Sequence, residues 1–198
     1  MEGERRSSPE VPTVTGVRPV GDAQGVSWPR ADALRTDRLS LEPLAVRHAS
    51  EMTRALAPLA LYRFTGGEPP TYDELGARYR RQARGRSDDG RAGWLNWIIR
   101  PIGGGPAIGF VQATLTRRGV ELVADLAWLV TVSEQGRGLA REAGAAVVAW
   151  LPSIGVGRLQ AHVHPDHTAS ARVAEGLGLA PTTTLVDGEM LWEAMTAP

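Results

Sequence analysis

The chain has 198 residues, with 22 basic and 22 acidic side chains, and its formal net charge at pH 7 is zero. It contains no cysteine and every basic residue is arginine, which excludes disulfide bonds, cysteine nucleophiles and lysine Schiff bases. The balanced charge argues against binding to the phosphate backbone of nucleic acids, no apolar run is long enough to span a membrane, and the N-terminus lacks the apolar core of a secretory signal. We therefore expect a cytoplasmic globular protein that binds neither nucleic acid nor membrane.

The first 33 residues differ from the rest of the chain in composition. Residues 1–33 are rich in glycine, proline and charge and show little periodicity, so they are predicted to form a flexible N-terminal extension. Trp28 either docks on the folded part or, as its setting slightly favours, stays in solvent. One domain is expected over residues 34–198, a length that can bury a sizeable core.

The first part of this domain is predicted to contain one strand and two helices. Residues 38–43 alternate between apolar and polar side chains, which indicates a strand. Residues 46–57 have the spacing of a helix that a proline ends. Thr71, with Glu74 three residues later, forms a capping box, which predicts a helix over residues 72–83.

A run of strands and helices follows. Three strands joined by short turns are predicted to form an antiparallel meander, over residues 94–100, 107–116 and 120–132. The third is almost wholly apolar, which favours a central strand buried on both faces. The remaining elements are a helix over residues 139–151, a strand over 158–164, a helix over 168–177 and a hairpin over 182–195 with Asp187-Gly188 at its turn. This order predicts an α+β (mixed α/β) domain with helices on both faces of one sheet.

The chemically informative segment lies between the long apolar strand and the next helix. Its sequence is Gln135-Gly-Arg-Gly-Leu-Ala140. The start of a helix leaves several backbone N–H groups unpaired, glycines there let an anion approach the backbone, and Arg137 and Arg141 add positive charge. A phosphate or pyrophosphate is the expected ligand, although a plain strand-to-helix turn would use the same glycines.

Three segments, in order along the chain, carry a family resemblance. Residues 34–41 read LRTDRLSL, residues 124–143 contain the glycine-rich segment, and residues 164–179 read HPDHTASARVAEGLGL. They resemble, in turn, the LxTxRLxLR, AEIGYWLxPxxQGRGxAxEA and HPxNxASxRVxEKxGF segments of the RimJ/RimL-type branch of the GNAT superfamily of acyl-CoA-dependent N-acetyltransferases. The resemblance implies the GNAT fold, a central, mostly antiparallel sheet with one splayed pair of parallel strands and helices on both faces.

The resemblance also implies where acetyl-CoA, the acyl donor, would bind. The pantetheine arm would lie between the splayed strands and contact the main chain, and the pyrophosphate would accept hydrogen bonds from N–H groups of residues 137–141. His167 stands where the family has an asparagine that contacts CoA, and Gly176 stands where it has a lysine. The residues so assigned to the cofactor are Leu129, Val130, Val132, Gln135, Gly136, Arg137, Gly138, Leu139, Ala140, Arg141 and His167. No metal is expected, although His162, His164 and His167 form an HxHxxH pattern.

Two residues are candidates for the proton transfers of an acetyl transfer. Asp125 aligns with the acidic residue of the family segment and interrupts an apolar strand, so it is a candidate general base; a structural carboxylate is the alternative. Many members of the family place a tyrosine near the leaving thiolate, but none of Tyr62, Tyr72 and Tyr79 occupies that position. Ser170 is then the nearby hydroxyl, and capping of a helix is its alternative role. The tetrahedral oxyanion would be held by a backbone N–H group at the splay, at Val130.

The acceptor implied by the resemblance is a primary amine, and the sequence leaves its identity open. A protein N-terminus and a small-molecule amine such as an aminoglycoside are both compatible, as is a non-catalytic acyl-CoA sensor on the same fold, and a homodimer is left open. The candidate substrate contacts are Tyr62, Phe64, Glu68 and Trp97. An acidic cleft that would suit a polyamine is conceivable from Glu51, Glu68, Asp73, Glu74 and Glu193. Because there is no cysteine, direct attack in a ternary complex is favoured over an acyl-cysteine route.

Overall fold

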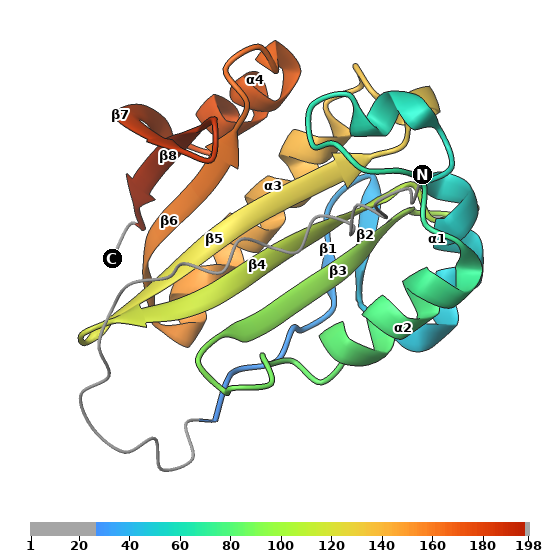
Figure 1. The fold of residues 1–198 in the computed structure, drawn as a ribbon. Helices are drawn as coiled ribbons and strands as arrows, with labels where there is room; N and C mark the ends of the chain where they lie inside the picture. The colour runs from blue at the N-terminus through green and yellow to red at the C-terminus, as the bar shows by residue number, and fades with distance from the viewer. Residues whose placement is uncertain (1–26, 197–198) are drawn as a thin grey trace, which may run out of the picture.

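The computed structural model describes residues 27–196, which form one mixed sheet flanked by helices (Figure 1). The strand order is β1-β2-β3-β4-β5-β6-β8-β7. The strands are Leu34–Arg35 (β1), Leu39–Pro43 (β2), Gly93–Pro101 (β3), Gly109–Arg118 (β4), Glu121–Val130 (β5), Val156–Val163 (β6), Ala180–Val186 (β7) and Glu189–Met195 (β8). The α-helices are Ala49–Ala55 (α1), Tyr72–Gln82 (α2), Leu139–Trp150 (α3) and Thr168–Gly176 (α4). The predicted α+β class and the β3–β4–β5 meander are confirmed. Within this range no helix combines the length and apolar character that a membrane crossing needs.

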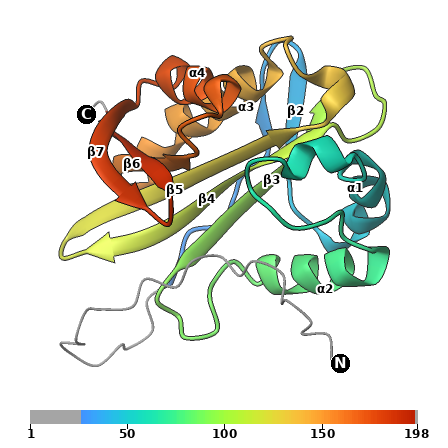
Figure 2. The ribbon, with the colours of Figure 1, turned by 45° about the horizontal axis from the view of Figure 1, so that its top comes forward.

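Each face of the sheet has its own apolar core. On one face, α3 and α4 pack against the strands, and the buried side chains of β3 there include Leu95 and Trp97. On the other face, α1 and α2 pack on the β3 side of the sheet, where Met52, Leu75 and Ile98 are fully buried (Figures 1 and 2). Alternate residues of β3 therefore feed the two cores, as the period of a strand requires.

The second face is open further along the sheet, at β5. The Asp125 side chain is 43% exposed, and Ala127 on the same face is also exposed. The prediction that this strand is buried on both faces is therefore wrong for its middle. The apolar run gives the composition of the strand, but burial of its second face depends on which part of the sheet α1 and α2 pack against.

One pair of neighbouring strands in the sheet is parallel. β5 and β6 are parallel from Leu122/Val156 to Asp125/Gln160, and no pairing between them continues beyond that point. Both strands nevertheless run on, β5 to Val130 and β6 to Val163. The expected splayed parallel pair is thus present.

The capping signal of α2 is confirmed. The Thr71 hydroxyl accepts a hydrogen bond from the Glu74 N–H at 3.3 Å, and the Glu74 carboxylate accepts one from the Thr71 N–H at 2.8 Å. The predicted helix over residues 46–57 is interrupted near its start, because residues 46–48 form a 3₁₀ turn before α1.

Trp28 docks on the domain, so the expectation of a solvated side chain is wrong. Its indole lies against Gly93 of β3, where a Cβ atom would come within 2.6 Å of the ring, and its Nε1 donates to the Gly90 carbonyl at 3.0 Å. The Arg117 guanidinium lies 5.7 Å from the ring centroid. Residues 27–33 of the predicted extension thus contact the domain, and residues 1–26 lie outside the described part of the chain.

Replacing Trp28 with alanine is expected to lower the free energy of unfolding by about 1–2 kcal/mol, because the indole is only partly buried. Urea unfolding followed by circular dichroism measures the loss. Leu59→Ala is the control, because it also truncates a large apolar side chain but one that is 71% exposed. It is expected to change the free energy of unfolding by less than about 0.5 kcal/mol. Equal effects for the two variants would contradict the docking of Trp28.

Candidate active site

Beyond the end of the β5–β6 pairing, one edge of β5 has no partner strand within the described residues. The Thr131 N–H donates to the Ile108 carbonyl of the β4 side at 2.7 Å. Successive N–H groups of a strand point to opposite edges, so the Val130 N–H points to the edge that β6 leaves. The main chain of Leu129, which was predicted to contact the cofactor, instead faces β4, with which Leu129 is in register through Phe110. The main chain therefore presents the N–H of Val130, and not that of Leu129, on the side of β5 that β6 leaves.

The glycine-rich turn places the start of α3 beside this splay. Gly136 and Gly138 have φ values of 74° and 76°, a left-handed conformation that glycine adopts without strain. Gly138 is the N-cap and α3 begins at Leu139 with no side-chain cap, so the N–H groups of the first turn are open to an external acceptor. Between β5 and this turn, Val132 is 42% exposed, and the Gln135 side chain donates to the Val130 carbonyl at 2.9 Å.

Arg38 holds this turn in place, a role that the sequence analysis did not assign. Its Nη1 donates to the Arg137 carbonyl at 3.2 Å, and its Nε donates to the Glu142 carboxylate of α3 at 2.6 Å. The Thr36 hydroxyl donates to the same carboxylate at 2.5 Å. Thr36 and Arg38 belong to the LxTxRL-like segment, which was the signal available for finding them. The Arg137 side chain pairs with Glu134.

Arg141 lies across α4. The aliphatic part of its side chain passes over Gly176, where a Cβ atom would come within 2.4 Å of the Arg141 Cδ. The glycine that replaces the family's lysine therefore makes room for an arginine from the neighbouring helix. This packing fixes the stem of Arg141 next to the glycine-rich turn.

Gly176→Ala is expected to displace Arg141, which the family resemblance assigns to the pyrophosphate of CoA, and so to weaken CoA binding roughly threefold to tenfold. Calorimetric titration with CoA measures the change. Gly157→Ala in β6 is the control, since a Cβ atom there has no neighbour closer than 3.8 Å and φ is not positive. Unchanged affinity in Gly176→Ala would remove Arg141 from the binding site.

The third family segment forms the turn from β6 into α4. His167 is the N-cap of α4, and its Nδ1 accepts a hydrogen bond from the Ser170 N–H at 3.4 Å. The cap is thus supplied by the imidazole and not by the Ser170 hydroxyl. Because Nδ1 accepts, the neutral ring carries its proton on Nε2, and burial lowers the pKa of His167.

Phe64 joins the predicted acceptor loop to this turn. Its ring stacks on His167 with centroids 4.2 Å apart and an interplanar angle of 21°, and it lies 5.5 Å from the His164 ring. Tyr62 lies in the same loop with its hydroxyl donating to the Leu56 carbonyl at 2.9 Å, and burial raises the pKa of this phenol. Glu68, further along the loop, is exposed. Of the predicted substrate contacts, Phe64 is thus the one seen to touch a predicted cofactor residue, His167.

Trp97, the fourth predicted substrate contact, lies elsewhere. Its side chain is fully buried among the α3-side core, where its Nε1 donates to the Asp32 carbonyl at 2.7 Å and its ring meets Trp150 edge-on. The prediction is corrected for a simple reason: odd-numbered residues of β3 face α3, away from the acceptor loop.

Asp125 lies against His162 of β6 on the open face of the sheet. Its Oδ2 is 3.2 Å from the His162 Nδ1, and the side chains are 43% and 27% exposed, respectively. The hydrogen bond to Asp125 raises the pKa of His162. Since Asp125 is not buried, the sequence argument from a buried carboxylate does not hold, and its partner is an imidazole, not an arginine.

The predicted acidic cleft does not form from the five carboxylates named for it. Glu51 is bound by Arg100 at 2.6 Å and by the Ala107 N–H, Glu74 caps α2, and Glu193 lies 3.9 Å from Arg158. Three of the five are therefore engaged in structural contacts on different elements. Within residues 27–196, no three His, Asp or Glu side chains gather in a way that could hold a metal ion.

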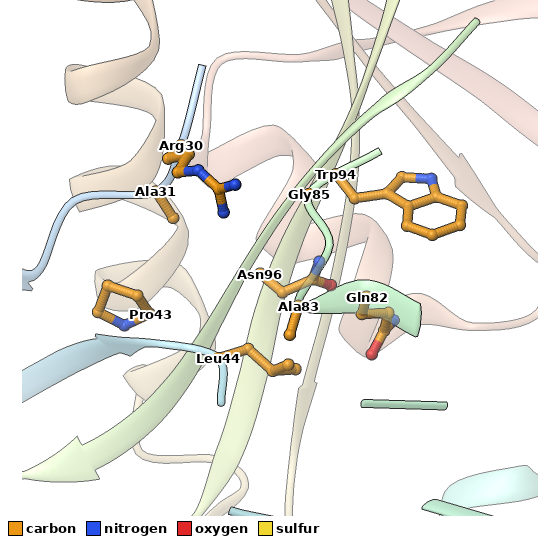
Figure 3. Close-up of a pocket in the computed structure, with 9 residues that line it drawn as sticks. All are labelled: Arg30, Ala31, Pro43, Leu44, Gln82, Ala83, Gly85, Trp94 and Asn96. Atoms are coloured by element: carbon orange, nitrogen blue, oxygen red, sulfur yellow. The ribbon is translucent and has the colours of Figure 1, made fainter. Parts of the chain in front are cut away.

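A small pocket lies away from the β5–β6 splay, on the face that α2 covers. Figure 3 shows that its lining comes from the N-terminal segment, β2, α2 and β3. The lining residues are Arg30, Ala31, Pro43, Leu44, Gln82, Ala83, Gly85, Trp94 and Asn96. It contains none of the residues predicted to bind cofactor or acceptor, so the splay remains the candidate active site.

Known structures share the fold of this chain. A GnaT-family acetyltransferase from Bordetella pertussis is 27% identical, with a TM-score of 0.63 over 82% of this chain and 98% of that one. A ribosomal-protein-serine acetyltransferase from Vibrio cholerae is 14% identical, with a TM-score of 0.62 over 83% and 97%. The microcin C7 self-immunity acetyltransferase MccE, solved with acetyl-CoA and AMP, is 13% identical, with a TM-score of 0.65 over 81% and 93%. The last two likenesses show the fold alone.

Comparison of the sequence with known families identifies the same domain. No curated protein sequence matches the chain. The family described as "Acetyltransferase (GNAT) domain" matches residues 38–180, which include the splay, the glycine-rich turn and the turn into α4. The chain has the GNAT fold and belongs to the GNAT acetyltransferase family.

Proposed function

We propose that the protein transfers an acetyl group from acetyl-CoA to a primary amine by direct attack in a ternary complex. Two observations carry this proposal: the β5–β6 pairing ends at Asp125/Gln160, and the uncapped start of α3 follows the far end of β5 through the glycine-rich turn. MccE, which shares the fold, was solved with acetyl-CoA, and this supports the same donor here. The absence of cysteine leaves no thiol for an acyl-enzyme.

The cofactor is proposed to lie along the splay. The edge of β5 between Asp125 and Val130, which β6 leaves unpaired, is proposed to offer main-chain groups to the amides of pantetheine. The Val130 N–H is the proposed donor to the oxyanion of the tetrahedral intermediate. The first-turn N–H groups of α3, with Arg141, bind the pyrophosphate. The His167 Nε2 proton is the donor that replaces the family's asparagine, and the Ser170 hydroxyl is the proposed proton donor to the leaving thiolate.

The acceptor that the site supports best is the N-terminal amine of a protein chain. The face of β5 that carries Asp125 is open, and the carboxylates that would make a polyamine cleft are spread over several elements. An open face admits an extended peptide, whereas a small polyamine needs convergent acids. The fold likeness to a ribosomal-protein-serine acetyltransferase agrees with the RimJ/RimL-type segments of the sequence.

A thiol-release assay with acetyl-CoA and a panel of amines tests the proposal. We expect CoA release with peptides that have a free N-terminus, weaker release with polyamines and aminoglycosides, and none with N-acetylated peptides. Calorimetry should show CoA binding, and ATP or NAD should not raise the melting temperature. CoA binding without turnover on any amine would indicate a sensor, and no CoA binding would end the proposal.

A further inference from the structure

We infer that His162 is the group that takes the proton from the acceptor ammonium and that Asp125 positions it, an assignment that rests on the proposed acetyl transfer. The juxtaposition of the two side chains at the opening of the splay carries this inference.

The pair lies where the parallel strands separate. Asp125 and Gln160 form the last matched pair of β5 and β6, and His162 follows Gln160 by two residues, so its side chain lies on the same face of the sheet. The gap between the strands begins at this point, and the thioester proposed at Val130 lies further along β5. An amine that enters over the open face at Asp125 is proposed to pass His162 on its way to the thioester.

The contact with Asp125 decides which nitrogen of His162 can act. The Nδ1 faces the carboxylate at 3.2 Å and donates its proton there. In the neutral ring, Nε2 then carries the lone pair, on the edge of the ring turned away from Asp125. The side chain is 27% exposed, so part of the ring is accessible from solvent, and Nε2 is assigned to that part.

The charges around His162 suit a base that works near neutral pH. They come from three strands: Asp125 of β5 and Glu189 of β8 raise the pKa of the imidazole, and burial and Arg118 of β4 lower it, with a net increase led by the Asp125 hydrogen bond. An imidazole titrates close to neutral pH, so His162 can both accept a proton from an ammonium and release it to water in that range.

The proton and electron pairs balance without another reactant. The bound ammonium gives one proton to His162 Nε2, and its nitrogen lone pair forms the C–N bond at the thioester carbonyl. The C–S bond then breaks, and the thiolate takes the second proton of the former amine, directly or through Ser170. The imidazolium loses its proton to water, so each turnover yields an amide, a thiol and one released proton.

The pH dependence of His162→Gln tests the assignment. We expect kcat/KM at pH 7 to fall roughly 10²–10⁴-fold, with unchanged CoA affinity and melting temperature. The deficit should shrink as the pH rises towards the pKa of the acceptor amine, because more of the amine then arrives neutral. A loss of packing alone would give the same deficit at every pH.

Asp125→Asn provides an independent readout. Activity of a general base rises with pH through its pKa, and removal of the carboxylate lowers the pKa of His162, so the acid limb of the profile should move to lower pH while kcat falls. Glu189→Gln is the matched control, since Glu189 acts on His162 only through its charge; its kcat at optimal pH should equal that of the wild type.

The outcomes separate this inference from the proposed function. If the wild type neither binds CoA nor releases thiol with any amine, acetyl transfer itself fails. If the wild type turns over and His162→Gln keeps its rate and its acid limb, or loses activity equally at every pH, the role of His162 is overturned and acetyl transfer stands.

Discussion

Gly109→Ala is expected to destabilise the domain by about 3–5 kcal/mol and to abolish CoA binding. A Cβ atom on Gly109 would lie 2.0 Å from the Leu129 carbonyl oxygen and 2.9 Å from the Val130 Cα. Both are backbone atoms of β5, so no rotamer change relieves the clash and the strand must move. The part of β5 that must move includes Val130, the residue proposed to face the thioester.

Urea unfolding and calorimetry with CoA measure the two effects of Gly109→Ala. Gly76→Ala is the control, because Gly76 lies in α2 and its Cβ would meet only the Arg80 side chain, at 3.7 Å. In a helix this change removes backbone freedom from the unfolded chain, so Gly76→Ala should stabilise by about 0.5–1 kcal/mol. A mild effect of Gly109→Ala would mean that β4 and β5 are less closely apposed than described.

Arg100→Met is expected to cost about 2–4 kcal/mol of stability at pH 7. The guanidinium binds Glu42 at 2.8 Å and Glu51 at 2.6 Å, and it donates to the Gly105 carbonyl at 2.7 Å. His48, which is buried beneath Glu42 at 3.2 Å, extends the cluster. Removal of Arg100 leaves two carboxylates, each at most 30% exposed, without their cation.

The cost of Arg100→Met should depend on pH. Hydrogen bonds from Arg100 hold the pKa values of Glu42 and Glu51 below the ordinary 4.5, so the stabilisation is present above that value and is lost as the pH falls through the lowered pKa values. The difference in unfolding free energy between wild type and variant should therefore shrink in acid. Arg84→Met, which breaks the exposed pair with Asp88, is the control and should cost at most about 0.5 kcal/mol at any pH. A pH-independent loss in Arg100→Met would point to packing instead of charge.

Local signals predicted most of the elements. The capping box at Thr71, the glycine turn before α3 and the Asp187-Gly188 hairpin each depend on a few neighbouring residues, and all three form as expected. The short strand β1 was missed because two residues carry no periodicity. The docking of Trp28 was missed because the gap at Gly93 that receives the indole is distant in sequence.

The sequence predicted less well how the helices and strands pack against one another. An apolar run cannot tell which strand α1 and α2 will cover, so the open face at Asp125 was not foreseen. Leu129 was misassigned because the edge to which its main chain points is fixed by the register with β4. His162 was considered only as part of a histidine pattern, since its contact with Asp125 follows from the β5–β6 register and not from spacing along the chain.

The position of β8 has a consequence for how the domain is made during translation. β8 is inserted between β6 and β7, and it pairs with β6 along Arg158–Met195 to Val163–Met190. In a nascent chain that has emerged only as far as α4, the only described strand paired with β6 is β5, through their short parallel contact. The strand that bears His162 gains its second neighbouring strand only when residues 189–195 leave the ribosome, so the acceptor face is completed after every other strand of the sheet has been made.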